Sequence, residues 1–254
     1  MTTTLRFDIQ PQPDNATCGP TCLHAVYRYF DDPIALSRVI ADVPMLKGGG
    51  TLSVHLANHA LRRGYQATII PYNLKVFDPT WSYVPPCDIA DKLRRQRAVK
   101  RGLPGFGRVT DAYLEYLHLG GRLKFEVLTA ALIRKHLNRG IPIMTGLSAT
   151  YLYDSAREYD LDGRVVYDDV RGESVGHFVV LAGYNRRTRC ARVADPFLPN
   201  PMADGQYYSV DIYRLVCAIM LGTLTDDGDL LILQPKRGQL KRGQPERVQK
   251  GLRR

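Results

Sequence analysis

The run Gly-His-Phe-Val-Val-Leu-Ala-Gly-Tyr at residues 176–184 constrains the fold most, because it is the most strand-like segment of the chain. A second segment, residues 188–194, follows it across the short turn at residues 185–187 and is expected to pair with it. Two strand patterns joined by so short a turn predict an antiparallel hairpin. We therefore expect an antiparallel sheet in the C-terminal half of the chain.

The segments that precede this hairpin are mainly helical in pattern. Apolar residues recur at helical spacing in residues 18–30, 34–41, 52–63, 88–100, 110–119 and 128–138, and again in 210–220. Strand patterns occupy residues 5–9, 66–72, 141–147 and 230–233. Helices first and antiparallel strands afterwards indicate an α+β fold rather than a wound parallel sheet. We expect one domain over residues 1–234, followed by a basic, low-complexity tail over residues 235–254 that is predicted to be disordered.

The net charge of +10 suggests a nucleic-acid partner at first sight, but its location weakens that idea. The tail at residues 235–254 holds eight Lys or Arg and one Glu, so it carries most of the excess. A second basic cluster at residues 92–101 fits a solvated helix face, and no pattern of a nucleic-acid-binding module accompanies either cluster. A nucleic-acid partner is therefore disfavoured.

Other features of the sequence predict a protein of the cytoplasm. The chain has no run of about eighteen apolar residues, which predicts no transmembrane helix and no membrane partner. Residues 1–8 lack the apolar segment of a secretory signal. Five cysteines without regular spacing, in a chain large enough to fold without disulfides, favour free thiols in a reducing compartment.

Cys18 lies where an irregular segment turns into the predicted helix at residues 18–30. Thr17 is expected to cap that helix, and Pro20 falls in its first turn, where a missing N–H is harmless. A thiol at a helix N-terminus faces the positive end of the helix dipole, which favours the nucleophilic thiolate. Because most free cysteines are simply small buried apolar residues, the chain must also supply partners for Cys18.

Three further residues have the chemistry that a nucleophilic thiol needs. His177 opens the strand at residues 176–184 and can act as the base, and the returning strand ends at Asp195, so that the hairpin brings this carboxylate back toward the imidazole. Gln12, on an extended segment before Cys18, has an amide that suits a developing oxyanion. Gln10 is the competing candidate, at a spacing that fits less well.

Taken together, these motifs resemble the cysteine peptidases that process bacteriocin leaders at double-glycine sites, in the form of a free-standing member. The resemblance rests on Gln12, on Cys-Gly-Pro-Thr-Cys-Leu from Cys18, on Gly-His-Phe-Val-Val-Leu around His177 and on Asp-Pro-Phe from Asp195. It implies a bacterial thiol protease of papain-like fold, with N-terminal helices packed on a C-terminal antiparallel sheet. It also implies Cys18 as nucleophile, His177 as base, Asp195 as the residue that orients the base and Gln12 as oxyanion donor.

The chain departs from that family in two long segments. Residues 44–121 and 148–175 are insertions, and no transporter segment is attached, so a double-glycine leader is not implied as the substrate. The polar segment 148–175 has the length of a functional lid, and the candidate substrate-binding residues within it or beside the nucleophile and base are Tyr151, Tyr153, Arg157, Gly19 and Gly176.

Three functions remain open at this point. The first is a hydrolase that cleaves a peptide or isopeptide bond through a Cys-His-Asp triad, and the second is an amide-forming transferase that uses the same thioester. The third is a non-enzymatic binding module that acts through the basic tail. A zinc site at His55 and His59 is disfavoured, because the intervening residues lack the glutamate of the metalloprotease pattern. No cofactor is expected, and no pattern indicates the oligomeric state.

Overall fold

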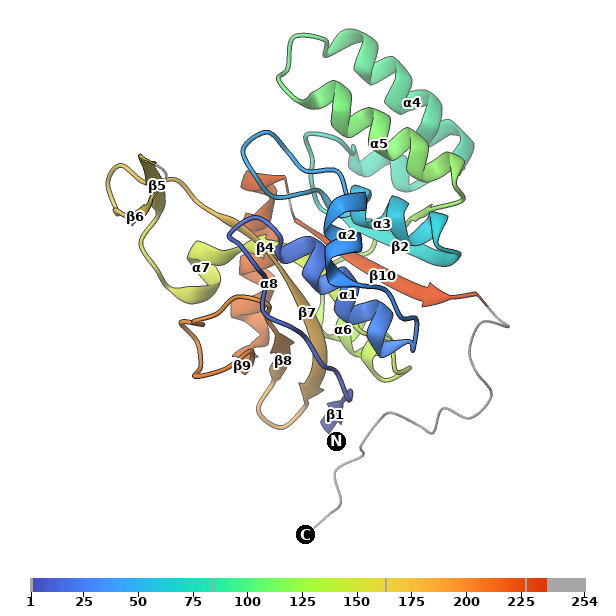
Figure 1. Ribbon diagram of the computed structural model, residues 1–254. Coiled ribbons are helices and arrows are strands. Elements are labelled where there is room, and N and C mark those ends of the chain that lie inside the picture. The colour runs from blue at the N-terminus through green and yellow to red at the C-terminus, as the bar shows by residue number, and fades with distance from the viewer. Residues whose placement is uncertain (1, 84, 163, 227, 237–254) are drawn as a thin grey trace.

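The computed structural model describes residues 2–83, 85–162, 164–226 and 228–236. At the centre of this described part is an eight-stranded sheet in the order β3-β2-β10-β4-β7-β8-β9, with β1 also paired to β7 (Figure 1). The strands of this sheet are β1 (Thr2–Thr4), β2 (Tyr65–Pro71), β3 (Arg122–Leu123), β4 (Ile143–Ser148), β7 (Gly176–Asn185), β8 (Cys190–Ala194), β9 (Tyr207–Asp211) and β10 (Asp229–Pro235). A separate hairpin consists of β5 (Glu158–Leu161) and β6 (Arg164–Tyr167).

Helices from the first half of the chain pack on this sheet. Helix α1 lies on β7 and α3 on β2, while the later helix α8 lies on β4. The helices are α1 (Cys18–Tyr29), α2 (Leu36–Asp42), α3 (Ser53–Arg62), α4 (Pro86–Val99), α5 (Phe106–His118), α6 (Ala130–Leu137), α7 (Ala149–Tyr153) and α8 (Ile212–Leu221). The prediction of an α+β fold with N-terminal helices on an antiparallel sheet is confirmed, although the short β3 runs parallel to β2.

The predicted hairpin at residues 176–194 forms the middle of the sheet. Strand β7 pairs antiparallel with β4 on one edge and with β8 on the other. Its residues 177–184 are all buried, which explains why the sequence there reads as a nearly continuous apolar run. Gly183 is required in this strand, because a Cβ there would lie 2.7 Å from the carbonyl oxygen of Thr3 in β1.

Two predicted elements have different boundaries in the structure. Of the strand expected at residues 5–9, Leu5 alone pairs with the sheet in the described part of the chain, through its N–H to the carbonyl oxygen of Ala182 in β7 at 2.8 Å, and the alternating residues Leu5, Phe7 and Ile9 are buried in the core. The helix expected at residues 210–220 begins at Ile212, because the side chain of Asp211 caps it and residues 207–211 pair with β8 instead. The alternation of the first segment thus reports burial rather than strand pairing.

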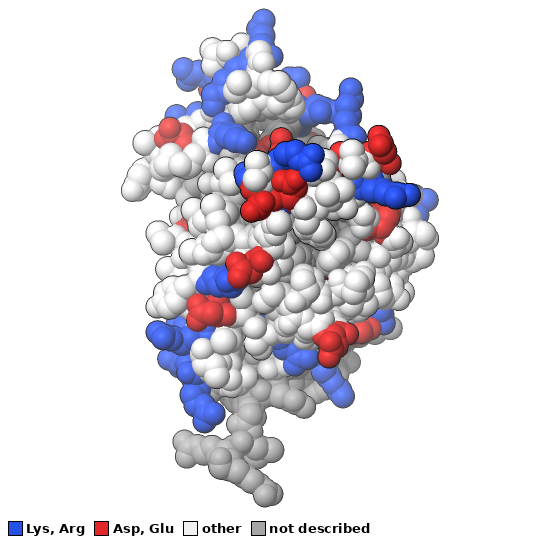
Figure 2. All heavy atoms as spheres, turned by 90° about the vertical axis from the view of Figure 1, so that its left-hand side faces the viewer, with Lys and Arg blue, Asp and Glu red and all other residues white. Residues whose placement is uncertain are grey.

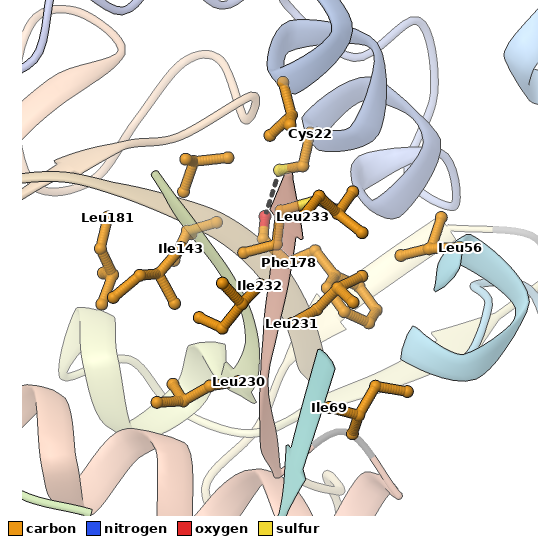
Figure 3. Close-up of a cluster of buried hydrophobic side chains, with 14 of the residues drawn as sticks. Cys22, Leu56, Ile69, Ile143, Phe178, Leu181, Leu230, Leu231, Ile232 and Leu233 are labelled. Carbon is orange, nitrogen blue, oxygen red and sulfur yellow. Dashed lines mark hydrogen bonds between the residues drawn. The ribbon is translucent and has the colours of Figure 1, made fainter. Parts of the chain in front are cut away.

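The contact between α1 and β7 sets the position of Cys18. One turn after Cys18, the Cys22 thiol is fully buried and donates a hydrogen bond to the carbonyl oxygen of Phe178, at 3.3 Å (Figure 3). Phe178 directly follows His177, so this contact fixes the start of α1 against the start of β7. Leu56 of α3 and Ile143 of β4 belong to the same buried cluster.

The two predicted insertions have structure of their own. Residues 44–121 include α4 and α5, which lie side by side at the top of Figure 1. Lys and Arg side chains gather at that end of the molecule in Figure 2, where the basic cluster of residues 92–101 lies on α4. The segment 148–175 contains α7 and the β5–β6 hairpin. Beyond residue 236, the predicted basic tail lies outside the described residues. None of the helices in the described ranges is long and apolar enough to cross a membrane.

We predict that Gly19→Ala destabilises the fold. A Cβ at Gly19 would lie 2.7 Å from Cγ2 of Thr51 and 3.3 Å from the Phe178 ring, so α1 or its neighbours must shift. Overpacking of this kind costs about 1–3 kcal/mol of the free energy of unfolding, which urea denaturation measures. Gly102→Ala is the matched control, because its Cβ would meet nothing within 4 Å. Equal stability of the two variants would contradict the tight contact.

Candidate active site

Cys18 is the first residue of α1 and is buried, with 7% of its surface exposed. The predicted Thr17 cap is wrong: among the described residues the buried Thr17 hydroxyl has no hydrogen-bond partner, and no side chain caps the helix. The N–H of Gly19 in the first turn therefore stays available, and it interacts with the Cys18 sulfur together with the N–H of Phe178 from β7. An uncapped helix N-terminus offers an anion N–H groups and the positive end of the dipole.

His177 and Asp195 meet at the open end of the β7–β8 hairpin, away from its turn. Nε2 of His177 lies 2.8 Å from Oδ1 of Asp195, and both residues are buried. The other ring nitrogen is left for the thiol, and a side-chain hydrogen bond links Cys18 and His177. The hairpin and the α1–β7 contact thus bring together the three residues that the sequence predicts as nucleophile, base and orienting carboxylate.

The electrostatics of the three side chains favour an ion pair between Cys18 and His177. Burial opposes ionisation of the Cys18 thiol, but the charge and hydrogen bond of His177 outweigh it, so the pKa of Cys18 lies below its ordinary value. Burial also opposes the charge on His177, but Asp195 and then Cys18 raise its pKa to about 10. Thiolate and imidazolium therefore coexist between the lowered pKa of Cys18 and the raised pKa of His177.

Four donors satisfy the buried carboxylate of Asp195, whose exposed fraction is 0%. Oδ1 accepts from Nε2 of His177 at 2.8 Å and from the backbone N–H of Phe197 at 2.9 Å. Oδ2 accepts from the hydroxyls of Tyr153 at 2.8 Å and Tyr208 at 2.7 Å. Burial opposes the negative charge, but His177 and these hydrogen bonds hold the pKa of Asp195 below its usual range. The site thus keeps a charged carboxylate without contact with water.

Tyr208 is a site residue that sequence reasoning missed, and Tyr153 has a contact other than the one predicted. Burial, followed by the charge of Asp195, raises the pKa of both phenols, so each is a neutral donor. Tyr153 also packs its ring against those of His177 and Phe197, at centroid distances of 6.1 Å and 6.3 Å. No local signal marks Tyr208, because only the pairing of β9 with β8 brings it to Asp195.

Gln12 is tied to the site by its backbone rather than by its side chain. Its N–H donates to the carbonyl oxygen of Pro196 at 2.9 Å, directly after Asp195. The side-chain Nε2 donates to the carbonyl oxygen of Asp14 at 2.7 Å, and among the described residues the buried Oε1 has no partner. The rival Gln10 lines a separate surface hollow with His24 and Arg28.

A cleft of about 650 Å³ opens at Cys18. Residues 48–51 form part of one wall, and Glu158, Glu173 and Gly176 lie along another. Gly176, a predicted substrate-binding residue, therefore lines the cleft beside the nucleophile. A larger hollow of about 900 Å³ lies between α5 and residues 44–48, but Cys18 lines only the smaller cleft, so we place the reactive site there.

The other predicted substrate-binding residues do not line this cleft. Gly19 is buried where α1 packs on its neighbours. The carbonyl oxygen of Tyr151 accepts a hydrogen bond from Arg214, whose guanidinium lies 5.5 Å from the centre of the Tyr151 ring. Arg157 donates to the backbone carbonyl of Asp169 at 2.5 Å and so braces its own segment. Substrate contact at these residues stays a prediction.

Of the two histidines of the disfavoured zinc site, His59 packs against α1, whereas His55 lines the hollow beside α5. Nδ1 of His59 lies 2.8 Å from the hydroxyl of Tyr27, and the ring is buried. Within the described ranges no group of three or more His, Cys, Asp or Glu side chains could hold a metal ion.

Comparisons with known proteins give only general likenesses. No protein-family model and no curated protein matches the sequence. Among solved structures, a double glycine motif protease from an AMS/PCAT transporter, in complex with the leader peptide, aligns at a TM-score of 0.43 and 13% identity, over 93% of this chain and 99% of that one. A protein described as a C39-like peptidase from Bacillus anthracis aligns at 0.46 and 11%, over 92% and 98%. Xylellain, a cysteine protease from Xylella fastidiosa, aligns at 0.43 and 14%, over 93% and 86%. With TM-scores below 0.5, the case for a function rests on the side chains themselves.

We predict that the pH dependence of Cys18 alkylation depends on the charge of Asp195. The lowered pKa of Cys18 keeps the thiolate present below the usual range of a thiol, so iodoacetamide should react there. Asp195→Asn removes the charge that raises the pKa of His177. The imidazolium then loses its proton at lower pH, so it stabilises the Cys18 thiolate less. The alkylation profile of Cys18 should shift by about 1–3 pH units to higher pH. Asp204→Asn is the control, and an unchanged profile in Asp195→Asn would contradict this coupling.

We also predict that Tyr153 and Tyr208 stabilise the fold through Asp195. Removing either hydroxyl deletes a hydrogen bond to a buried charge, so Tyr153→Phe or Tyr208→Phe should each lower the free energy of unfolding by about 1.5–3 kcal/mol. The double variant should lose more than the sum, because Oδ2 is then left without a donor. Urea denaturation measures both effects, with the exposed Tyr213→Phe as control. Strict additivity would argue against a shared carboxylate.

Proposed function

We propose that this protein is a thiol-dependent hydrolase of peptide or isopeptide bonds, a cysteine peptidase. The observation that carries the proposal is the buried chain of contacts from Cys18 through His177 to Asp195, at the edge of a cleft large enough for a peptide segment. A depressed thiol pKa beside a raised histidine pKa is the arrangement that a covalent acyl-transfer mechanism uses.

In the proposed reaction the Cys18 thiolate attacks the carbonyl carbon of the scissile amide. The electron pair of the carbonyl moves onto its oxygen and returns as the C–N bond breaks, while the His177 imidazolium gives its proton to the leaving amine. Neutral His177 then accepts a proton from water, and the resulting hydroxide attacks the thioester and releases the carboxylic acid and the Cys18 thiolate. Asp195 holds the His177 ring and stabilises its charged form throughout.

The oxyanion of this reaction needs donors near Cys18. The uncapped first turn of α1 supplies the backbone N–H of Gly19 beside the sulfur. We propose that Gln12 adds its side-chain amide, which must then leave the carbonyl oxygen of Asp14 to which it donates at 2.7 Å. The backbone contact of Gln12 with Pro196 supports this role, because it keeps the residue next to the loop that holds Asp195.

A peptide is the proposed substrate, in accord with the likeness to a protease in complex with the leader peptide. We propose a reducing compartment such as the cytoplasm for this protein, because the mechanism requires Cys18 as a free thiol and Cys18, Cys22, Cys190 and Cys217 are all free.

A peptide library tests the activity without a known substrate. The proteins of a cell extract are digested with a protease that cleaves after Glu residues, and the resulting peptides are incubated with the protein. New peptide termini are then identified by mass spectrometry. Cys18→Ala and His177→Ala should abolish cleavage, and the intact protein should form a thioester at Cys18 that can be trapped. Cleavage retained in full by Cys18→Ala would rule the proposal out.

The role of Gln12 has its own prediction on the same library. Gln12→Ala should lower kcat by about 10²–10³-fold with little change in KM, because an oxyanion donor acts in the transition state. Gln10→Ala is the matched control, because the same amide is removed from a residue in a separate hollow. Equal loss of activity in the two variants would contradict the assignment of Gln12.

A further inference from the structure

The cleft at Cys18 has walls whose charges are mostly of one sign. The carboxylate residues Glu158, Asp160 and Glu173 line it, all from the segment between α7 and β7. The β5–β6 hairpin, which forms part of this segment, points toward the viewer in Figure 2. A substrate carbonyl that reaches the Cys18 sulfur must lie in this space, so the charge of the walls acts on the substrate directly.

One cationic residue, Arg171, lines the cleft within the described part of the chain, and its charge is already paired. Its guanidinium donates to the carboxylate of Asp168 at 2.7 Å and lies 4.7 Å from the centre of the Tyr159 ring. The Asp168 carboxylate also accepts from the backbone N–H of Arg171, so Asp168 pairs with both the backbone and the side chain of this residue. Arg171 therefore does little to neutralise Glu158 and Glu173.

Glu158 and Glu173 stand directly opposite each other across an antiparallel bridge. Their backbones exchange two hydrogen bonds, of 3.0 Å and 2.7 Å, so the two side chains start from neighbouring positions. Like charges at directly opposed positions destabilise a pair of strands. In the part of the chain that the structure describes, no Lys or Arg lies within ion-pair distance of either carboxylate. The fold thus keeps two neighbouring carboxylates without a Lys or Arg ion pair on the wall of the cleft.

The position of Glu158 relates this repulsion to the reacting groups. Burial raises the pKa of its half-buried carboxyl, while a hydrogen bond from Tyr167 and the positive charge of His177 act in the opposite direction. Glu158 is therefore close enough to His177 for their charges to interact. A cation held by Glu158 and Glu173 would lie in the same cleft as Cys18, near the scissile bond.

On the premise that Cys18 is the nucleophile of the proposed hydrolase, we propose that the cleft selects peptides with a Lys or Arg side chain beside the scissile bond, held by Glu158 and Glu173. A guanidinium or ammonium group on a long side chain matches two neighbouring carboxylates in charge and in hydrogen-bond donors. Glu158 and Glu173 are then specificity-determining residues of the site, separate from the groups that perform the chemistry.

The charge preference of the cleft can be measured at Cys18 itself, before any substrate is known. Two methanethiosulfonate reagents of similar size, the trimethylammonioethyl cation and the sulfonatoethyl anion, are reacted with the full chain. Mass spectrometry of the peptide that contains Cys18 gives each rate, apart from labelling at other cysteines such as the exposed Cys217. Because the thiolate itself favours the cation, the readout is the change in the cation-to-anion rate ratio between variants.

The double variant Glu158→Gln and Glu173→Gln should lower this ratio by about tenfold at low salt, and the difference should shrink as salt screens the charges. Glutamine keeps the size of each side chain and can still accept the hydrogen bond from Tyr167, so the variant is expected to fold. Asp204→Asn removes an acidic charge from the loop before β9, which does not line the cleft, and should leave the ratio nearly unchanged.

The outcomes separate this inference from the proposed function. If Cys18 reacts with neither reagent, the acyl-transfer proposal fails and the substrate preference fails with it. A reactive Cys18 whose ratio is the same in the double variant would overturn the preference alone. In the peptide library, cleavage sites should be enriched in Lys or Arg within about two residues of the broken bond, and the double variant should lose that enrichment. Cleavage without enrichment would likewise overturn the preference and leave the hydrolase proposal intact.

Discussion

The buried charge of Asp195 is the constraint on which the arrangement of the site depends. A carboxylate with no exposed surface is very costly unless hydrogen bonds and an opposite charge replace its water. Here the replacements come from β7, from α7, from β9 and from the backbone after β8. The four segments must be in place together, so the sheet order β7-β8-β9 and the position of α7 are tied to the chemistry of one side chain.

The nucleophile is held by a second, mostly apolar set of contacts. Cys22 binds the backbone of Phe178, and Gly19 lets α1 approach its neighbours closely enough for Cys18 to reach His177. The first turn of α1 has neither a side-chain cap nor an acidic residue, so no other anion competes with the thiolate for its amides. Packing thus brings the thiol to the base, while the absent cap leaves the helix dipole to act on the sulfur.

The segment between β4 and β7 has two roles in the site. Its first part, α7, supplies Tyr153 to the carboxylate of Asp195. Its second part contains the β5–β6 hairpin and supplies the acidic wall of the cleft. Support of the site and selection of the substrate therefore come from one segment, which joins the sheet on both sides through β4 and β7.

The sequence by itself determined the features that depend on local pattern. The hairpin of residues 176–194, the helix that begins at Cys18 and the α+β order of the elements follow from periodicity and turn residues. Closure of the hairpin was enough to pair His177 with Asp195, because both lie at its open ends. The tertiary structure alone decided the remaining contacts of the site, because they join segments that are far apart in the sequence. Tyr208 reaches Asp195 through the β8–β9 register, Thr17 fails to cap α1, and Glu158 faces Glu173 across a bridge inside a polar segment without a clear period. These residues are placed by long-range pairing and burial, whose free energy depends on the whole fold rather than on neighbours in the chain.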